Sequence, residues 1–398
     1  MSIWANQREL ERHFDAAVVG GGPAGCAAAY ALARHGIKVV VFERGSPGRD
    51  KACGDMFVPA AVEELRRLGL AEQDLVEVGG APFDAVELLG SRGLLWRIRY
   101  PNEPVWILPR RSIDQKLRDG LSGMAEIVYQ GAVEGIVAEV ETSALPRFSA
   151  KGNWRLVGRI AAAGRLVPGA RSGLEPAGQE WKFSLRCQAV VIASGAQSNL
   201  ARTWGISGRP HLMPAISAYA QGSGFSAPAF EFAPGCRPGY CWLFPIGSSS
   251  APCGRDERGA LAAANVGVCA LEPIKGLELR ARGQKLLARH RLGGAVRWRG
   301  GAGALWSGCG QRWHHPAGLV ACGDAAGLID PLSGEGLTAA LRSGQAAGEA
   351  VANFLRDKLN PKWLEDYSAY VAETFSARYG RTGLRAAWKQ LCGLLDPP

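Results

Sequence analysis

Two glycine-rich segments at opposite ends of the chain place the strongest limits on its fold. The first carries Gly20, Gly22 and Gly25 in G-x-G-x-x-G spacing. It joins a predicted strand at 15–20 to a predicted helix at 24–35, and a second strand follows at 38–43. In such a βαβ unit the first glycine makes a tight turn, the second lets backbone approach a pyrophosphate and the third lets helix and strand pack closely. The pattern predicts a dinucleotide-binding turn.

The residues around this turn favour the same interpretation. Glu43 ends the second strand, where a carboxylate can accept hydrogen bonds from both ribose hydroxyls of a dinucleotide. A glycine-rich structural turn is the alternative. The order of strand, turn, helix, strand and carboxylate makes that alternative the weaker one.

The second glycine-rich segment begins with Gly323 and Asp324, after a predicted strand at 318–322. Gly334 and Gly336 then open a predicted helix at 335–356. Asp324 can accept hydrogen bonds from a ribityl chain, and the free N–H groups of the helix can face the flavin edge that becomes negative on reduction. An ordinary capped helix is the alternative. Taken together, the two segments predict the two ends of one extended FAD molecule.

Composition and charge exclude several other classes of protein. Charged residues make up 21% of the 398 residues, which is ordinary for a globular protein, so long disordered segments are not expected. The net charge of +10 is scattered without a basic block, which argues against nucleic-acid binding. The ten cysteines include no C-x-x-C pair, and we expect most to be reduced thiols of a cytoplasmic protein. Adjacent His314 and His315 point different ways, so no metal site is predicted.

The order of predicted elements gives an α/β fold. We expect a Rossmann-like FAD-binding domain, interrupted by an antiparallel β-sheet substrate domain and followed by C-terminal helices. The strand-rich pattern from 215 to about 268 marks the inserted sheet. The expected boundaries are 1–80, 110–207 and 300–358 for the FAD-binding domain, 81–109 and 208–299 for the substrate domain, and 359–398 for a helical cap. A loop is expected at 171–180.

Two further motifs connect the chain to a known family. Lys51, Cys53, Gly54 and Asp55 form a K-x-C-G-D sequence after the βαβ unit, and the inserted sheet carries Y-x-W-x-F-P-x-G from 240 to 247. Asn265, Val266 and Gly267 follow within a strand-like run. In this order of motifs the chain resembles the geranylgeranyl reductase family, within the wider p-hydroxybenzoate hydroxylase-like flavoproteins. The resemblance covers most of the chain.

The resemblance implies specific roles for residues of this chain. Those expected to hold FAD are Gly20, Gly22, Pro23, Ala24, Gly25, Glu43, Arg44, Cys53, Gly54, Arg110, Gly323, Asp324, Gly334 and Gly336. Cys53, Tyr240 and Trp242 are the candidate catalytic residues, and Tyr240, Trp242 and Phe244 are expected to bind substrate. Two alternatives stay open: Cys53 as an inert buried thiol, and the three aromatic residues as one face of a packed strand, since their alternate spacing suits either role.

The chain departs from the hydroxylases of this superfamily in one place. They carry an Asp-Gly pair associated with FAD and NAD(P)H, where this chain has Ser194 and Gly195. No second dinucleotide fingerprint follows, because Gly300, Gly301 and Gly303 lack the spacing. Electrons are therefore expected from transient NAD(P)H docking, or from a separate reductase or ferredoxin.

The leading functional hypothesis is reduction of a carbon–carbon double bond in an apolar prenyl or secondary-metabolite molecule. Cys53 is the first candidate for the acid that protonates the product, and Tyr240 is the second. An aromatic hydroxylase on the same fold is the alternative. A halogenase is less favoured because no lysine occurs from Ala52 to Ile113. A flavoprotein without catalytic activity is a minority hypothesis, and a peripheral contact with a membrane is left open.

Overall fold

The computed structural model describes most of the chain. The described residues are 8–9, 13–139, 154–161, 181–208, 211–232, 239–246, 261–271, 274–294, 296–306, 312–331 and 333–379. Some expectations lie outside them: the loop at 171–180, Gly247 of the aromatic motif, and the part of the helical cap beyond residue 379.

A mainly parallel sheet forms the centre of the first unit of the fold. Its order is β19 (His314–His315), β20 (Leu319–Ala321), β13 (Ala189–Ile192), β2 (Ala16–Val19), β3 (Val39–Glu43) and β9 (Glu126–Tyr129). Only the β19–β20 pair is antiparallel. Every residue of β2, β3 and β13 is buried. A sheet covered on both faces needs such continuous runs of alanine, valine and isoleucine rather than alternation.

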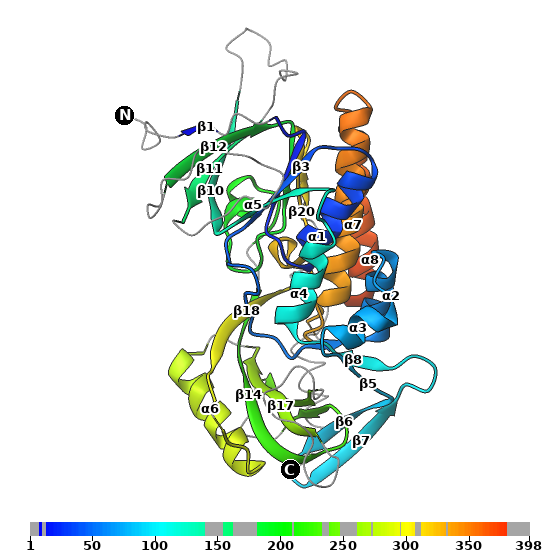
Figure 1. Cartoon of the computed structure of the whole chain (residues 1–398), viewed down its shortest axis with the longest axis vertical. Coiled ribbons are helices and arrows are strands. Elements are labelled where there is room, and N and C mark those ends of the chain that lie inside the picture. The colour runs from blue at the N-terminus through cyan, green and yellow to red at the C-terminus, as the bar shows by residue number, and fades with distance from the viewer. Residues whose placement is uncertain are drawn as a thin grey trace.

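Three helices cover one side of this sheet: α1 (Pro23–Arg34), α7 (Leu337–Arg356) and α8 (Lys362–Tyr379) (Figure 1). The other side faces a sheet in the order β1 (Arg8–Glu9), β12 (Trp181–Cys187), β11 (Trp154–Ile160) and β10 (Gly131–Ala138). Shorter elements complete the unit. They are β4 (Met56–Phe57), α2 (Pro59–Arg67), α3 (Glu72–Glu77), β5 (Ala81–Phe83), β8 (Val105–Ile107), α4 (Arg110–Asp119), α5 (Leu200–Thr203) and the 3₁₀ turn η2 (Gly323–Ala326).

Small residues hold α1 and α7 close together. A Cβ at Gly344 would lie 2.1 Å from the Ala24 carbonyl oxygen, and one at Gly348 would lie 2.4 Å from the Ala28 carbonyl oxygen. Neither position can take a side chain without separating the helices. This close packing places the start of α1, which carries the first glycine motif, beside the start of α7, which carries the second.

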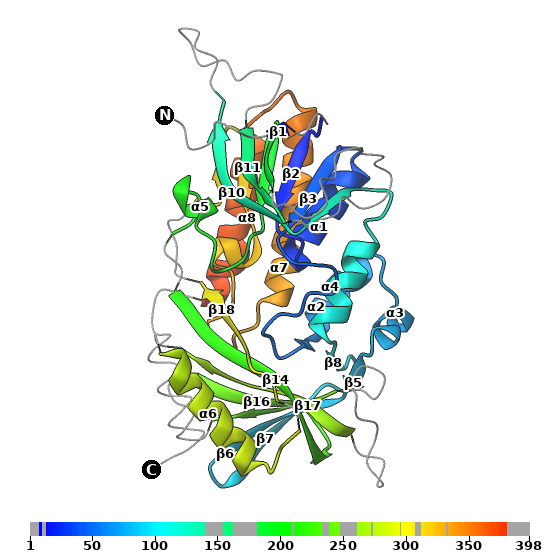
Figure 2. The ribbon, with the colours of Figure 1, turned by 60° about the vertical axis from the view of Figure 1, so that its left-hand side comes forward.

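A seven-stranded sheet forms the second unit. Its order is β18 (Arg299–Leu305), β14 (His211–Phe225), β17 (Leu261–Ala270), β16 (Gly239–Pro245), β15 (Ala229–Glu231), β6 (Ala85–Gly90) and β7 (Gly93–Arg99). All neighbours are antiparallel except β15 and β6. Helix α6 (Gly276–Arg289) covers one face, and the other face turns toward the first unit (Figure 2).

The predicted α/β fold with an inserted antiparallel sheet is confirmed. The run at Gly300, Gly301 and Gly303 lies in strand β18, paired with β14. The helix predicted from residue 335 begins at Leu337. Of the described cysteines, Cys26, Cys53, Cys187, Cys269 and Cys322 are free thiols. Cys241 is disulfide-bonded, and the expectation that most cysteines are reduced agrees with the other described cysteines.

Candidate functional site

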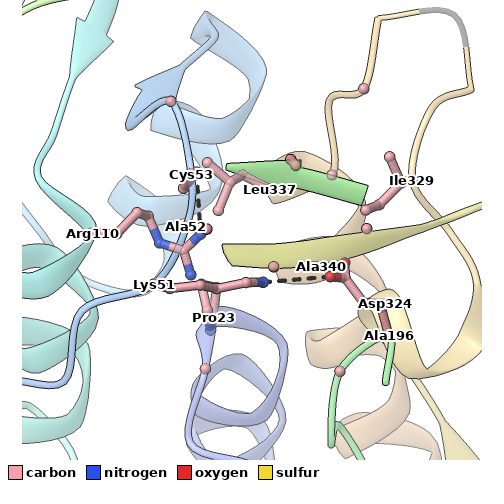
Figure 3. A pocket seen from close by; sticks show the side chains of 18 of the residues that line it. Pro23, Lys51, Ala52, Cys53, Arg110, Ala196, Asp324, Ile329, Leu337 and Ala340 are labelled. Atoms are coloured by element: carbon pink, nitrogen blue, oxygen red, sulfur yellow. Dashed lines mark hydrogen bonds and ion pairs between the residues drawn. The ribbon is translucent and has the colours of Figure 1, made fainter. Parts of the chain in front are cut away.

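A cavity of about 1,100 Å³ lies between the two units. Ligand pockets usually measure about 300–1,000 Å³, so this one has room for an extended cofactor and a second molecule. Its wall runs from the first glycine motif, past the segment at 51–54, to the aromatic strand β16 and the segment at 333–338. Figure 3 shows part of this wall, with Pro23, Cys53 and Leu337. The two sequence motifs predicted to bind one FAD molecule therefore border one continuous space.

The first glycine motif has the geometry that a dinucleotide turn requires. Gly20 has φ +112°, and a Cβ there would lie 2.3 Å from the Ala193 carbonyl oxygen. A Cβ at Gly25 would lie 1.7 Å from the Gly20 carbonyl oxygen, so only glycine lets α1 start so near β2. A Cβ at Gly22 would meet nothing within 4 Å, because this residue faces the cavity. The turn thus leaves an open approach for a pyrophosphate beside the helix N-terminus.

Glu43 and Arg118 stabilise this turn through hydrogen bonds to the backbone of Gly21. The Glu43 carboxylate is buried and accepts hydrogen bonds from the Gly21 N–H at 3.1 Å and the Gly45 N–H at 2.6 Å. Arg118, on α4, donates from Nη1 to the Gly21 carbonyl at 3.0 Å. Glu43 also lines the cavity, where its position suits the predicted contact with ribose. Sequence reasoning missed Arg118, since nothing near it marks a partner 97 residues away.

The second glycine motif borders the cavity opposite the segment at 51–54. Lys51 extends across the space above Pro23, and its Nζ lies 3.4 Å from Oδ2 of Asp324 (Figure 3). Gly323 has φ +58° and donates its N–H to Ser343 Oγ at 2.9 Å. This hydrogen bond ties η2 to α7. The K-x-C-G-D motif contains Lys51 but indicates no role for it.

The start of α7 brings an acid to the cavity wall. Glu335 accepts a hydrogen bond from the Thr338 N–H at 2.7 Å through Oε1, and its own N–H donates to Ser333 Oγ at 3.2 Å. The first contact ties the Glu335 side chain to the first turn of α7, which begins at Leu337. Burial raises the pKa of Glu335 above its ordinary value. A cavity-lining carboxyl that keeps its proton to higher pH can act as an acid, and the sequence reasoning missed it.

Cys53 lies at the cavity wall beside Arg110. Arg110 Nη1 approaches Cys53 Sγ at 3.6 Å, and the Asp55 N–H approaches the same sulfur at 3.4 Å. Arg110 also forms a bidentate pair with buried Asp114, at 2.7 and 2.8 Å. Burial lowers the pKa of Arg110, but its interactions with Asp114 and Cys53 together more than offset that effect, and the pKa is raised. Both groups are hydrogen-bond donors directed at the sulfur.

Asp55 anchors the loop that carries Cys53. Its carboxylate is 1% exposed and accepts hydrogen bonds from Asn265 Nδ2 at 2.6 Å and the Tyr219 hydroxyl at 2.8 Å. The Arg110 N–H lies 3.2 Å from its Oδ1. Burial raises the pKa of Asp55 to about 6 despite these donors. The residue has φ 65°, a left-handed conformation that aspartate tolerates better than most side chains.

Asn265, on β17, connects this loop to the aromatic strand. Besides Asp55, its Nδ2 donates to the Cys53 carbonyl at 2.8 Å, while its Oδ1 accepts from Trp242 Nε1 at 2.9 Å. In the sequence, Asn265 is marked only as part of a strand-like run. The available signal was an amide inside an apolar strand, since a buried polar side chain must find partners.

The aromatic side chains of β16 form the far wall of the cavity. The Tyr240 hydroxyl donates to the Ser333 carbonyl at 3.0 Å, and burial raises the pKa of Tyr240 well above its ordinary value. A Cβ at Gly54 would lie 2.6 Å from Phe244, and one at Gly267 would lie 2.0 Å from the Trp242 ring. Glycine at both positions thus lets the rings pack closely against the loop and the neighbouring strand.

Most of the predicted site residues border the cavity. Those on its wall are Gly20, Gly22, Pro23, Ala24, Glu43, Arg44, Cys53, Gly54, Arg110, Tyr240, Trp242, Phe244, Asp324, Gly334 and Gly336. Gly25 and Gly323 pack behind the wall. Ser194, in the place of the missing aspartate, also lines the cavity, and its buried hydroxyl has no hydrogen-bond partner among the described residues. A buried hydroxyl without a protein partner suits contact with a bound molecule.

Comparison with known proteins agrees with this geometry. A family model described as an FAD binding domain matches residues 13–377. The chain is 29% identical over 353 residues to a menaquinone reductase of Mycolicibacterium smegmatis, covering 85% of this chain and 76% of the relative. It is 29% identical over 383 residues to digeranylgeranylglycerophospholipid reductase 1 of Methanopyrus kandleri, covering 91% and 87%. A geranylgeranyl bacteriochlorophyll reductase-like protein of Thermoplasma acidophilum shares the fold, with TM-score 0.74, 20% identity and coverage of 97% and 88%.

Proposed function

The chain belongs to the family of FAD binding domains and is an FAD-dependent oxidoreductase, and on this premise we propose that it reduces a carbon–carbon double bond of an apolar, prenyl-type molecule. One observation carries the proposal. A single cavity joins the dinucleotide turn at one end to an aromatic wall at the other, with Cys53 between them. The menaquinone and digeranylgeranylglycerophospholipid reductases among its relatives are named for substrates of this chemical kind.

The proposed FAD contacts follow the cavity wall. Gly20 and Gly22 leave room for the pyrophosphate, Glu43 receives the adenosine ribose, and Asp324 receives the ribityl chain. The other proposed contacts from the cavity wall are Pro23, Ala24, Arg44, Cys53, Gly54, Arg110, Gly334 and Gly336. When bound in its reduced form, FAD supplies the hydride. The residues of this chain hold the cofactor, orient the substrate and supply a proton.

The proposed substrate end of the cavity is apolar except for the groups that handle a proton. Trp242 and Phe244 exclude water there, which strengthens every nearby electrostatic interaction. Cys53 is the first proposed proton donor because two N–H groups approach its sulfur and can hold the thiolate left after donation. Glu335 is a second candidate, since its pKa is raised. Tyr240 is the weaker candidate because its hydroxyl proton is already donated to Ser333.

The electron donor is proposed to be NAD(P)H that docks transiently, or a separate reductase or ferredoxin. Ser194 stands where related hydroxylases carry an acid, and its small unpaired hydroxyl leaves the adjoining part of the cavity open. Stopped-flow reduction of the bound flavin by NADPH, by NADH and by reduced ferredoxin distinguishes these donors.

Anaerobic single-turnover mixing tests the function. Photoreduced holoenzyme is mixed with a menaquinone or an unsaturated prenyl lipid in detergent, and flavin absorbance is followed together with the mass of the product. We expect reoxidation of the flavin and a gain of two hydrogens in the product. Cys53→Ser should slow reoxidation, while Cys187→Ser, at a buried thiol away from the cavity, should not. Failure to reoxidise with every prenyl substrate overturns the proposal.

The alternative, an aromatic hydroxylase activity, is tested with the same holoenzyme in the presence of oxygen. Oxygen uptake coupled to substrate, with one oxygen atom added to the product, would identify that activity. A double-bond reductase adds hydrogen alone and needs no oxygen.

A further inference from the structure

Strand β7 is the edge of the seven-stranded sheet and is exposed along its whole length. It nevertheless carries large apolar side chains: Trp96 is 67% exposed, Leu94 58%, and Leu95 and Ile98 39% each. In Figures 1 and 2, β6 and β7 lie at the end of the molecule remote from β10 and β11. Such a contiguous apolar edge at one end of a molecule marks a surface that binds something.

The apolar edge continues the wall of the cavity. The sheet register sets Trp242 opposite Phe230, Phe230 opposite Leu88, and Leu88 opposite Trp96. Paired residues on neighbouring strands project from the same face of a sheet, so these four side chains form one row. The first three line the cavity, as does Ile98 on β7. With strands about 4.8 Å apart, the row runs on the order of 15 Å from Trp242 to the exposed edge.

The positive charge of the hairpin indicates which kind of surface it binds. The hairpin at 85–99 contains three arginines, Arg92, Arg97 and Arg99, against one glutamate, Glu87, which pairs with Arg97 at 3.7 Å. Along β7, Trp96 and Ile98 pair with cavity-lining residues of β6, whereas Arg97 and Arg99 alternate with them and project from the opposite face. Tryptophan and arginines along one exposed edge are the combination that holds proteins at an anionic lipid surface, with the rings at headgroup level.

A second copy of the chain is the alternative partner for β7, because the exposed edge of a sheet can pair with a strand of another molecule. The pairing of β6 with β7 shifts register between Leu88 and Leu89, which places a bulge in the hairpin. Bulges twist an edge away from regular pairing, and arginines along it oppose the approach of an identical strand. These features favour a lipid surface over self-association.

We propose that the β6–β7 hairpin docks on an anionic phospholipid bilayer, and that the row from Trp96 to Trp242 leads an apolar chain from the bilayer into the cavity. The docking proposal is supported by the exposed apolar edge and its positive charge, and it does not depend on the identity of the substrate. The entry route rests on the proposed function, because it assumes an apolar substrate.

Vesicle co-sedimentation of the FAD-loaded protein tests the docking without any turnover. Vesicles of phosphatidylcholine with phosphatidylglycerol are compared with vesicles of phosphatidylcholine alone. We expect binding to the anionic vesicles that falls as salt is raised, since each arginine near such a surface contributes about fivefold in affinity. The double variant Leu94→Ser/Trp96→Ser should weaken binding at least about tenfold. Leu277→Ser is the matched control, because Leu277 is 82% exposed but lies on α6.

Several outcomes would overturn the docking. Equal binding of wild type and the double variant to vesicles, or binding that Leu277→Ser weakens as much, removes β7 from the interface. Sedimentation of wild type as a dimer that the double variant converts to monomer assigns the edge to a second copy instead. Circular dichroism and flavin content of the double variant check its fold. If vesicles bind but no prenyl substrate reoxidises the flavin, the proposed function fails while the docking survives.

Discussion

Asn265 donates a hydrogen bond to Asp55 at 2.6 Å, and this contact fastens the loop that carries Cys53 to the sheet that walls the cavity. The same amide nitrogen also reaches the Cys53 carbonyl at 2.8 Å. One side chain therefore sets the position of the candidate acid relative to the aromatic strand.

Replacing Asn265 by alanine should destabilise the protein and displace Cys53. Asp55 and the Trp242 indole would each lose a partner in a buried setting, and an unsatisfied buried group costs about 1–3 kcal/mol. We expect a lower melting temperature and slower flavin reoxidation by substrate. Asn102→Ala, on an exposed loop, is the control and should change stability by less than about 0.5 kcal/mol. Equal melting temperatures for the two variants would contradict this account.

The stability of the protein should depend on pH through Asp55. Its pKa is raised from 3.8 to about 6 in the folded state, so the native protein holds this proton more tightly than the unfolded chain. The contribution of Asp55 therefore favours folding below about pH 4 and is lost as the pH rises through about 6. The loss is about 3 kcal/mol. In urea titrations from pH 4 to 7, Asp55→Asn should remove this decline from the profile. A variant profile parallel to that of wild type would show that Asp55 titrates normally.

Gly22→Ala should weaken FAD binding without disturbing the fold. A Cβ at Gly22 meets no protein atom within 4 Å, but it would project into the cavity where the pyrophosphate is proposed to lie. Overpacking costs about 1–3 kcal/mol, so we expect Kd for FAD to rise about tenfold to a hundredfold. Gly276→Ala, also in open space but on α6, serves as control and should bind FAD normally. Flavin fluorescence titration of the apoprotein measures both. Unchanged affinity in Gly22→Ala would place the pyrophosphate elsewhere.

Gly54→Ala should impair substrate binding more than cofactor binding. The added Cβ would lie 2.6 Å from the Phe244 ring and 3.3 Å from Trp242 Nε1, so the aromatic wall must shift. We expect KM for a prenyl substrate to rise about tenfold with a smaller change in kcat. Gly293→Ala meets no atom within 4 Å and is the matched control. A fall in kcat at unchanged KM would mean that the loop acts on the chemical step instead.

The sequence predicted the parts of the site that depend on local pattern. Gly20, Gly22 and Gly25 have a fixed spacing at a strand-to-helix turn. The aromatic residues at alternate positions in 240–244 predict one face of a strand. The hydrogen bonds that position the site were not predictable in this way. Asp55 and Asn265 are separated by 210 residues, and Arg118 and Gly21 by 97, so only the completed fold brings them together. The raised pKa of Glu335 likewise depends on burial that no spacing reveals.

The parallel pairing of β6 with β15 has a consequence for how the chain is made. Residues 85–90 leave the ribosome well before residues 229–231, with which they pair, so the hairpin waits on the order of ten seconds for its neighbour during synthesis. Until β15 arrives, the hairpin carries bare backbone on both edges and apolar side chains on its surface. The nascent protein is therefore most vulnerable to aggregation in that interval, and a chaperone that shields residues 85–99 would protect it.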